Sequence, residues 1–390
     1  MDYLEKMLSD DVFRRQEFPV TAGEVYMGHA GVSPFPRATA DAVRGHLFRS
    51  ERGSQDGVEG NDCIEQARQR AAMLLGADAE EIALLGPTSH GLGLVANGIA
   101  WEPGDEVVYY GDDYPSNAYP WQNLDGRGVR SVVLQSEYPG VITWDLVESA
   151  LTERTKLVAL ATCNFMSGYR IDLETIGRNL RERGVLFSVD AIQTLGAFET
   201  TVEHVDFLSS GGHKWLLSPM SSGIFYVRRA KWDVLKPTML GAMNVESPDY
   251  VTQDSIRFLN SAERYESGAL NLLGIAGMNA SMGLLLDVGL DAVSKQILEL
   301  RRAILERLRP HGYQTYLEST GYDDEAGDRQ SGIVVLTHPD KSMESLYECL
   351  GDAKVVASLR KNRAGKAFLR LSPHFYNTLD EVERVAGLLV

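Results

Sequence analysis

The chain has 390 residues, 44% of them hydrophobic and 24% charged, a composition typical of a globular protein with one large and one small domain or with two or three domains. The formal net charge of -16 argues against nucleic acid as a partner, because the phosphates would be repelled. The three cysteines, Cys63, Cys163 and Cys349, form neither a CxxC motif nor a metal-ligand spacing, which argues against a disulfide framework and a metal site.

The N-terminal sequence MDYLEKMLSD is acidic and lacks the apolar core of a signal peptide. No stretch of the chain approaches the ~20 apolar residues that a membrane span needs. We therefore expect a cytoplasmic protein that does not enter a membrane.

The first part of the chain predicts helices over 1–14, 37–49 and 63–75, with a turn-rich segment at 26–36. From residue 81, strands and helices alternate. The expected strands cover 81–85, 106–110, 131–135 and 157–162, followed by strands that end at Asp190, Ser209 and Val227; the expected helices cover 91–100, 117–124, 144–151 and 173–183. This alternation predicts an α/β fold with a mainly parallel sheet covered on both faces. The strand 223–228 is expected to be antiparallel, because only a short turn precedes it.

The last part of the chain has a different character. A long helical pattern over 272–308, broken at 287–289, precedes a mixed tail with strand or helix patterns at 332–336, 343–350, 354–358, 367–371 and 379–389. This tail predicts a small α+β domain over residues 286–390 beside a large domain over residues 26–285. The N-terminal segment 1–25 is expected to pack with the small domain.

Two of the predicted strands deliver a charged group at their carboxyl ends. One apolar strand ends in Asp190, and the next is followed by Ser209-Ser210-Gly211-Gly212-His213-Lys214. In an α/β sheet these ends meet at the edge where ligands bind, and desolvation there would lower the pKa of Lys214. Taken singly, Lys214 reads as a surface lysine and Asp190 as a helix N-cap.

Together, these two residues match the needs of one cofactor. Pyridoxal phosphate takes an amine for its covalent link and a carboxylate for its protonated ring nitrogen. Gln193, which follows Asp190 closely, could donate a hydrogen bond to the phenolic oxygen of the ring. The pattern therefore favours a pyridoxal phosphate site at Lys214 and Asp190.

The segment Leu84-Leu85-Gly86-Pro87-Thr88-Ser89-His90-Gly91 runs from a predicted strand into a predicted helix. Thr88 and Ser89 could be ordinary N-cap residues. The same geometry suits a phosphate, since free N–H groups and the helix dipole point at it; the Thr88 hydroxyl and the backbone of Ser89 and His90 would then be donors. The GxxxxGK[ST] and GxGxxG patterns are absent, which argues against a nucleotide-dependent enzyme.

Three further residues are candidates for the same site. Tyr114, in a loop after the strand 106–110, could stack on the cofactor ring and is favoured over Tyr119. Asn164, after the strand 157–162, could contact the ring oxygen or a substrate carboxylate. Arg370 lies in an apolar strand, where either a buried ion pair or a clamp for the α-carboxylate of an amino acid would explain it.

With these residues in place, the chain resembles the class V aminotransferases, in the branch that includes cysteine desulfurases, isopenicillin N epimerase and cystine C–S lyases. The resemblance covers nearly the whole chain, from Gly28-His29-Ala30-Gly31 to the RLSPHFYNT segment around Arg370. It includes, in order, the segments GPTSHG, YPSNAYPW, CNFMSG, SVDAIQ, SGGHKW and RYESGALN. So many ordered matches are more specific than any single motif.

The resemblance implies a fold-type I pyridoxal phosphate enzyme with a seven-stranded, mainly parallel sheet, a small C-terminal domain and a homodimer with shared active sites. Lys214 would bind the cofactor covalently and Asp190 would face the ring nitrogen. Gln193 and Asn164 would flank the ring oxygen, Thr88 and His213 would hold the phosphate, and Arg370 would bind the substrate carboxylate. The turn with Gly268 and Ala269 would approach the phosphate in the partner subunit.

The resemblance also implies an α-amino acid substrate, bound as an external aldimine from which Lys214 removes the Cα proton. The resulting carbanion leads to transamination, β-elimination or epimerisation. A desulfurase would need a nucleophilic cysteine before Arg370, but residues 351–369 contain none, and Cys349 is expected to be a core residue. Amino-group transfer is therefore favoured, with C–S lysis of a cysteine derivative next. A non-catalytic member of the fold is disfavoured, because Lys214 and Asp190 are both present.

Overall fold

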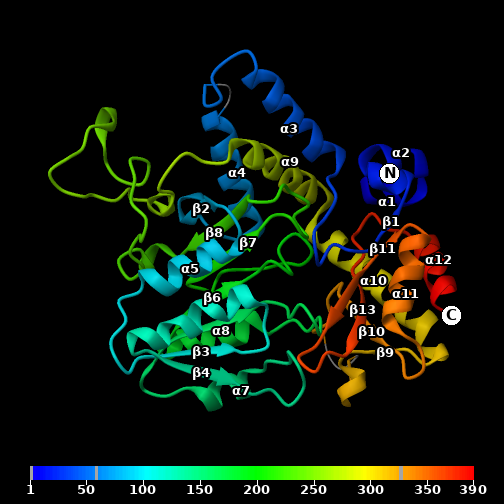
Figure 1. The fold of residues 1–390 in the computed structure, drawn as a ribbon. Helices are drawn as coiled ribbons and strands as arrows, with labels where there is room; N and C mark the ends of the chain where they lie inside the picture. The colour runs from blue at the N-terminus through cyan, green and yellow to red at the C-terminus, as the bar shows by residue number, and fades with distance from the viewer. Residues whose placement is uncertain (1–2, 58–59, 325–327) are drawn as a thin grey trace.

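The computed structural model describes residues 3–57, 60–324 and 328–390. Its centre is a seven-stranded sheet with the order β2-β8-β7-β6-β5-β3-β4 (Figure 1). The strand β8 (Gly223–Val227) is antiparallel to both neighbours, and the other pairs are parallel, which confirms the expected mainly parallel sheet. The remaining strands are β2 (Ile82–Leu85), β3 (Glu106–Tyr110), β4 (Arg130–Leu134), β5 (Thr155–Ala161), β6 (Leu186–Asp190) and β7 (Phe207–Gly211).

Helices cover both faces of this sheet. Successive residues of a strand point to opposite sides, so the apolar strands place side chains on both faces, and the helices bury them. In β5, Leu157 and Ala159 share an apolar cluster with α5, whereas Val158 and Leu160 share a cluster with α4, α8 and α9. Burial on both faces gives the uninterrupted apolar runs that the sequence shows. The helices here are α3 (Arg37–Ser50), α4 (Gly60–Leu75), α5 (Thr88–Gly98), α7 (Trp144–Ala150), α8 (Leu173–Glu182) and α9 (Leu272–Val288).

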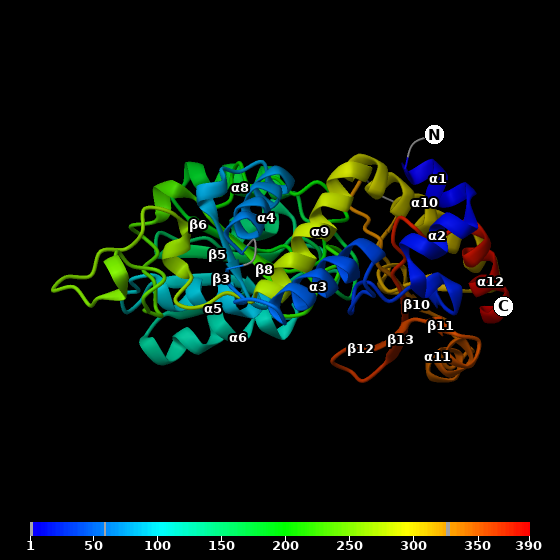
Figure 2. The ribbon, with the colours of Figure 1, turned by 90° about the horizontal axis from the view of Figure 1, so that it is seen from above.

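A second, four-stranded sheet with the order β12-β13-β10-β9 lies beside the first (Figures 1 and 2). All of its pairs are antiparallel, and a separate apolar cluster connects it to its helices. Its elements are β9 (Gln314–Thr315), β10 (Val334–Thr337), β12 (Ser358–Lys361), β13 (Ala367–Leu371), α10 (Leu290–Leu308), α11 (Met343–Asp352) and α12 (Leu379–Leu389). This is the α+β tail that the sequence predicts, and the domain limits at 25 and 285 stay a prediction.

The N-terminal segment lies against this C-terminal part of the chain (Figure 2). The short strand β1 (Val25–Tyr26) pairs in parallel with β11 (Val355–Val356). Phe18 stacks on Tyr376 with the ring centroids 3.9 Å apart, and Arg14 forms a buried ion pair of 2.6 Å with Glu381. Apolar stacking and a buried charge pair thus fix the two ends of the chain to one another.

Two predicted helices differ from the structure. Residues 1–14 form two helices, α1 (Tyr3–Ser9) and α2 (Asp11–Glu17), because extended Asp10 caps the second by accepting a hydrogen bond from the Phe13 N–H. The expected helix 117–124 is a series of short turns, η3 (Pro115–Asn117), α6 (Tyr119–Gln122) and η4 (Asn123–Arg127), since prolines at 115 and 120 remove N–H donors.

The expectation of a core Cys349 is wrong. The thiol-bearing residue is exposed on α11, whose buried residues are Met343 and Leu350. Position 349 turns away from the face that these two residues present to the core, because adjacent helical positions point in different directions.

Among the described helices, no single one is long and apolar enough to cross a membrane. Only the pair Leu272–Val288 and Leu290–His311 passes such a test of length and composition, and that pair is bent by 82°.

A buried ion pair ties α4 to the turn before α9. Arg68 donates two hydrogen bonds of 2.6 and 2.8 Å to Glu266, and its guanidinium also bonds the Ile82 carbonyl. Glu266 in turn accepts a hydrogen bond from the Leu84 N–H in β2. Both charged side chains are about 95% buried, at 5% exposure each. Removing one partner would leave the other charge buried and unpaired.

We therefore predict that Glu266→Gln lowers the free energy of unfolding by about 3–5 kcal/mol. Glu80→Gln is the matched control, because Glu80 pairs with Arg229 at the exposed surface and should cost less than about 1 kcal/mol. Urea denaturation followed by circular dichroism measures both values. Equal losses in the two variants would contradict the role given to the buried pair.

Candidate active site

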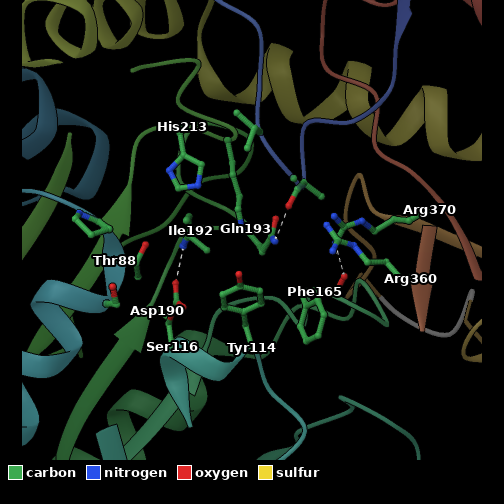
Figure 3. A pocket seen from close by; sticks show the side chains of 16 residues that line it. Thr88, Tyr114, Ser116, Phe165, Asp190, Ile192, Gln193, His213, Arg360 and Arg370 are labelled. Carbon is green, nitrogen blue, oxygen red and sulfur yellow. Dashed lines mark hydrogen bonds between the residues drawn. The ribbon is translucent and has the colours of Figure 1, made fainter. Parts of the chain in front are cut away.

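A cavity of about 340 Å³ lies at the carboxyl ends of β6 and β7, facing the strands β12 and β13 (Figure 3). It brings together eight of the residues that the sequence predicts for the site: Thr88, Ser89, Tyr114, Asp190, Gln193, His213, Lys214 and Arg370. The cavity wall also includes residues that the sequence analysis missed, among them Phe165 and Arg360. Their side chains could be placed only once the contacts between distant segments were known.

Lys214 and Asp190 form the charged centre of this cavity. Both are at least nine-tenths buried, with exposures of 8% and 3%. Burial lowers the pKa of Lys214 to about 8, and the Asp190 carboxylate limits this decrease. Burial raises the pKa of Asp190 to about 6, against a hydrogen bond of 3.0 Å from the Ile192 N–H to its Oδ1 atom. A large share of the lysine is therefore a neutral amine near pH 8.

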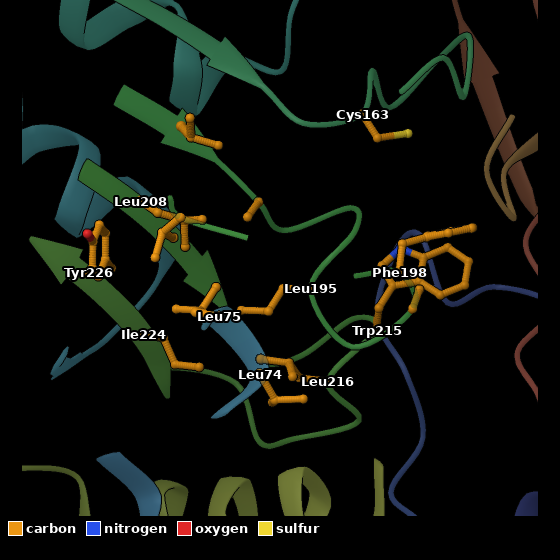
Figure 4. Close-up of a cluster of buried hydrophobic side chains, with 14 of the residues drawn as sticks. Leu74, Leu75, Cys163, Leu195, Phe198, Leu208, Trp215, Leu216, Ile224 and Tyr226 are labelled. Atoms are coloured by element: carbon orange, nitrogen blue, oxygen red, sulfur yellow. The ribbon is translucent and has the colours of Figure 1, made fainter. Parts of the chain in front are cut away.

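The backbone that carries Lys214 is held by apolar packing. The three residues that follow, Trp215, Leu216 and Leu217, are completely buried in the core on one face of the sheet (Figure 4). Leu217 adopts a left-handed φ of 57°, which is uncommon for a branched residue and persists only where packing imposes it. The position of the lysine is thus determined by the core beneath it.

The helix α5 directs its first turn at the same cavity. It begins at Thr88, and its N-cap is Pro87, which has no side-chain capping bond, so the N-cap reading of Thr88 and Ser89 is wrong. The Thr88 hydroxyl accepts a hydrogen bond of 2.8 Å from the Gly211 N–H, which ties the helix to β7. Ser89 and His213 line the cavity beside it. The arrangement is suited to an anion.

His90 does not take the place predicted for it. Its N–H donates to the Pro87 carbonyl at 2.8 Å and is therefore engaged within the first turn. Its side chain does not line the cavity, and the Nε2 atom is buried without a hydrogen-bond partner in the described structure. Thr88 and Ser89 remain as candidates for the anion contact.

The Gln193 side chain connects two segments of the site through hydrogen bonds. Its Nε2 atom donates to the Ala30 carbonyl at 3.1 Å, and its Oε1 atom accepts from the Trp215 indole at 2.9 Å. The amide therefore connects the N-terminal turn to the residue after Lys214. One amide hydrogen remains for a ligand, as predicted for the phenolic oxygen of the cofactor.

Tyr114 lies over the lysine. The Lys214 Nζ atom is 5.4 Å from the centroid of the Tyr114 ring, and Phe165 packs edge-on against that ring at 5.5 Å. Buried Asp113 fixes the loop by accepting a hydrogen bond of 2.7 Å from the Tyr114 N–H and one of 2.9 Å from Asn117. Tyr119 lies outside this cavity, in agreement with the preference for Tyr114.

Asn164 lies beside the cavity rather than in its wall. Its Oδ1 atom accepts from the N–H groups of Met166 and Ser167 at 3.0 and 2.9 Å, which closes its own loop. The residue lines a neighbouring cavity. These bonds use only the amide oxygen and leave the N–H donors that the ring oxygen or the substrate carboxylate would need, so that contact stays a prediction.

Arg370 is 1% exposed and points into the cavity from β13 (Figure 3). Its Nη1 atom donates to the Phe165 carbonyl at 3.0 Å, whereas Nε and Nη2 are buried and have no hydrogen-bond partner among the described residues. This pattern disfavours the buried ion pair, and the free edge of the guanidinium matches the two oxygens of a carboxylate.

Two further sets of residues lie away from the cavity: the turn that is predicted to approach the partner subunit, and the cysteines. Gly268 and Ala269 are exposed in the turn before α9, and their approach to a partner subunit stays a prediction. None of the cysteines lines the cavity: Cys163 is buried in the core, Cys63 is half-buried in α4, and Cys349 is exposed on α11.

Comparison with known proteins agrees with this geometry. The chain is 29% identical to a probable cysteine desulfurase from Methanothermobacter thermautotrophicus, over 98% of both chains. Its fold matches the cysteine desulfurase from Thermococcus onnurineus with a TM-score of 0.87 at 24% identity, over 98% of this chain and 97% of the other. It also matches the cystine C–S lyase C-DES with a TM-score of 0.85 at 19% identity, over 95% and 98% of the two chains. The fold is thus that of fold-type I pyridoxal phosphate enzymes, as expected. Residues 25–385 match the family described as Aminotransferase class-V, and the chain belongs to that family.

Proposed function

We propose that this chain is a pyridoxal phosphate enzyme that moves the Cα proton of an α-amino acid and transfers its amino group. The observation that carries the proposal is the buried Lys214 amine, which lies in a cavity with Asp190 and has a pKa of about 8. A neutral amine at that position can both attach a carbonyl compound and act as a base near neutral pH.

The residues of the cavity fit the cofactor. The start of α5 with Thr88 and Ser89, together with His213, offers donors for a phosphate. Asp190 offers a carboxylate for the ring nitrogen, and Tyr114 offers an aromatic face. When bound, pyridoxal phosphate supplies a covalent attachment for the substrate amino group and an electron sink for the charge that develops at Cα.

The protein residues then have separate tasks. Arg370 binds the α-carboxylate through its free Nε and Nη2 atoms. Lys214 would take the proton from Cα and deliver a proton to the cofactor carbon bonded to the amino nitrogen, and its buried stem restricts the amine to one face of the substrate. Tyr114 and Phe165 form the aromatic wall of the cavity beside the lysine.

Amino-group transfer is preferred over desulfuration. Relatives that carry the name cysteine desulfurase include the Methanothermobacter protein. In this chain, however, the segment between Arg360 and Arg370 contains no cysteine, and none of the three cysteines lines the cavity. The sulfur of a cysteine substrate would therefore find no protein thiol at the site on which to form a persulfide.

C–S lysis of a cysteine derivative is the second candidate. This reaction needs the same base at Lys214 and the same carboxylate clamp, and it needs no cysteine of the protein. The fold similarity to the cystine C–S lyase favours no reaction by itself, and a cavity wall without a cysteine is compatible with C–S lysis as well as with amino-group transfer.

We also propose a homodimer. The loop between β8 and α9 extends from the body of the molecule (Figure 1) and exposes large apolar side chains, namely Met239, Leu240, Met243, Tyr250, Val251 and Ile256. Clustered apolar residues on a projecting loop favour contact with another protein surface. The same loop leads to the turn with Gly268 and Ala269, which would place that turn near the partner's cavity.

The reaction is tested by product identification. We expect cofactor-loaded protein to convert a 2-oxo acid into an amino acid when a panel of amino donors is supplied, and Lys214→Ala to lose at least about 10²-fold in rate. Pyruvate from a cysteine derivative without any 2-oxo acid would establish C–S lysis instead. Alanine from cysteine, with one sulfur gained on a protein cysteine in the intact mass, would contradict both and favour a desulfurase.

The pKa of Lys214 gives a pH prediction for the cofactor-free protein. Only the neutral amine reacts with formaldehyde and cyanoborohydride, so the rate at Lys214 should rise with pH and level off above about 8. Since the Asp190 carboxylate raises the pKa of Lys214, Asp190→Asn should move this inflection to lower pH. Peptide mass spectrometry follows the reaction. An inflection above about 10, as for a free lysine, would show that the amine is not desolvated.

The dimer is tested by sedimentation at micromolar concentration. We expect Ile256→Glu to raise the dimer dissociation constant by about tenfold or more, because the charge would be buried at the subunit contact. Val12→Glu, at an equally exposed position on α2, should leave the constant unchanged. A wild-type monomer that turns over substrate would rule out shared sites.

A further inference from the structure

Arg360 joins Arg370 on the same face of the small sheet. In the antiparallel pairing of β12 with β13, Ser358 lies opposite Arg370 and Arg360 lies opposite Phe368. Residues that are two positions apart on a strand share a face, so the two arginines are diagonal neighbours across the hairpin. Both line the cavity, and Figure 3 shows their guanidinium groups side by side.

The tips of the two side chains converge beside Gly31. A Cβ atom added at Gly31 would lie 3.8 Å from the Nη2 atom of Arg360 and 3.8 Å from the Nη2 atom of Arg370. The N-terminal turn therefore leaves space at the point where the two cations meet, and a larger residue there would narrow it.

Neither guanidinium is neutralised by what surrounds it. The Nε atom of Arg360 is buried without a hydrogen-bond partner within the described ranges, as are Nε and Nη2 of Arg370. Burial and the charge of Arg360 lower the pKa of Arg370 to about 9, the direction expected when a second cation is near and no anion compensates. A buried cation beside a second, partly exposed cation is costly unless an anion binds between them.

Asp190, the carboxylate in the cavity, does not neutralise the two arginines. Asp190 acts on Lys214, whose pKa it raises while both arginines lower it. Arg360 is the cation that acts on Arg370, and the two other groups that act on it, Cys163 and Tyr114, supply no carboxylate. The α-carboxylate of an amino acid supplies one negative charge to this end of the cavity, so one guanidinium would remain without an anion.

We propose that the site takes a dicarboxylic α-amino acid and the corresponding 2-oxo acid, with Arg370 on the α-carboxylate and Arg360 on the side-chain carboxylate. The assignment follows from the atoms that are free. Arg370 keeps one edge, Nε and Nη2, for a two-oxygen contact, and Arg360 adds a second donor group on the side of Gly31. This inference deepens the proposed function and rests on it.

The test measures binding of ligands that lack an amino group, so that no reaction takes place. Calorimetry on the cofactor-loaded protein compares succinate with butyrate and glutarate with pentanoate at constant ionic strength in chloride buffer. We expect the better dicarboxylate to bind at least about tenfold more tightly than the monocarboxylate of equal length, the effect of one additional charged hydrogen bond.

Three variants separate the contribution of Arg360. Arg360→Gln should reduce the preference for dicarboxylates to less than about twofold and leave monocarboxylate binding unchanged. Arg360→Lys, which keeps the charge but loses the planar fork, should keep part of the preference. Lys366→Gln, an exposed position on the same hairpin, removes the same charge away from the cavity and should behave as wild type. Circular dichroism and cofactor absorbance verify that each variant is folded.

Equal binding of both ligand classes to the wild type, or a preference that survives in Arg360→Gln, would overturn the inference while leaving the proposed function in place. Failure of every carboxylate to bind would remove the Arg370 clamp itself and would count against both. Product formation at Lys214 is measured separately, so the two failures are distinguishable.

Discussion

The desolvation of a single amine governs the chemistry of this molecule. Lys214 lies three residues after the end of β7, and the three completely buried residues after it fix its backbone in the core. A lysine that is 8% exposed cannot keep its usual pKa, because the charged form loses its hydration. Asp190 at the end of the neighbouring strand limits the decrease, so the amine stays near the range in which a base works at neutral pH.

The charges of the cavity are divided between its two ends. One end has the first turn of α5 and His213, which suit a phosphate, and the other has Arg360 and Arg370, which suit carboxylates. The first set comes from the large sheet and the second from the small one. A substrate that contacts both ends therefore connects two sheets, and the packing between them determines the distance it must span.

Local patterns in the sequence predict much of this arrangement. Asp190 ends one apolar run and Lys214 follows the next after a short polar turn, and the parallel strands bring these ends to one edge, so their proximity is predictable without knowledge of distant contacts. The contact of Gln193 with Ala30 depends on a segment 163 residues away, and the pairing of Arg360 with Phe368 depends on strand register; one sequence reveals neither. The backbone N–H of His90 is engaged for a local reason, because it donates to the Pro87 carbonyl within its own turn, which the pattern of residue types does not show.

The central claim is that Lys214 is the residue to which the cofactor attaches, and borohydride reduction tests it most directly. Protein loaded with pyridoxal phosphate is reduced, digested and mapped by mass spectrometry. The account predicts one pyridoxyl group per chain, on Lys214, and a loss of the visible absorption band. A pyridoxyl group on another lysine, or protein that retains no cofactor after loading, would contradict it.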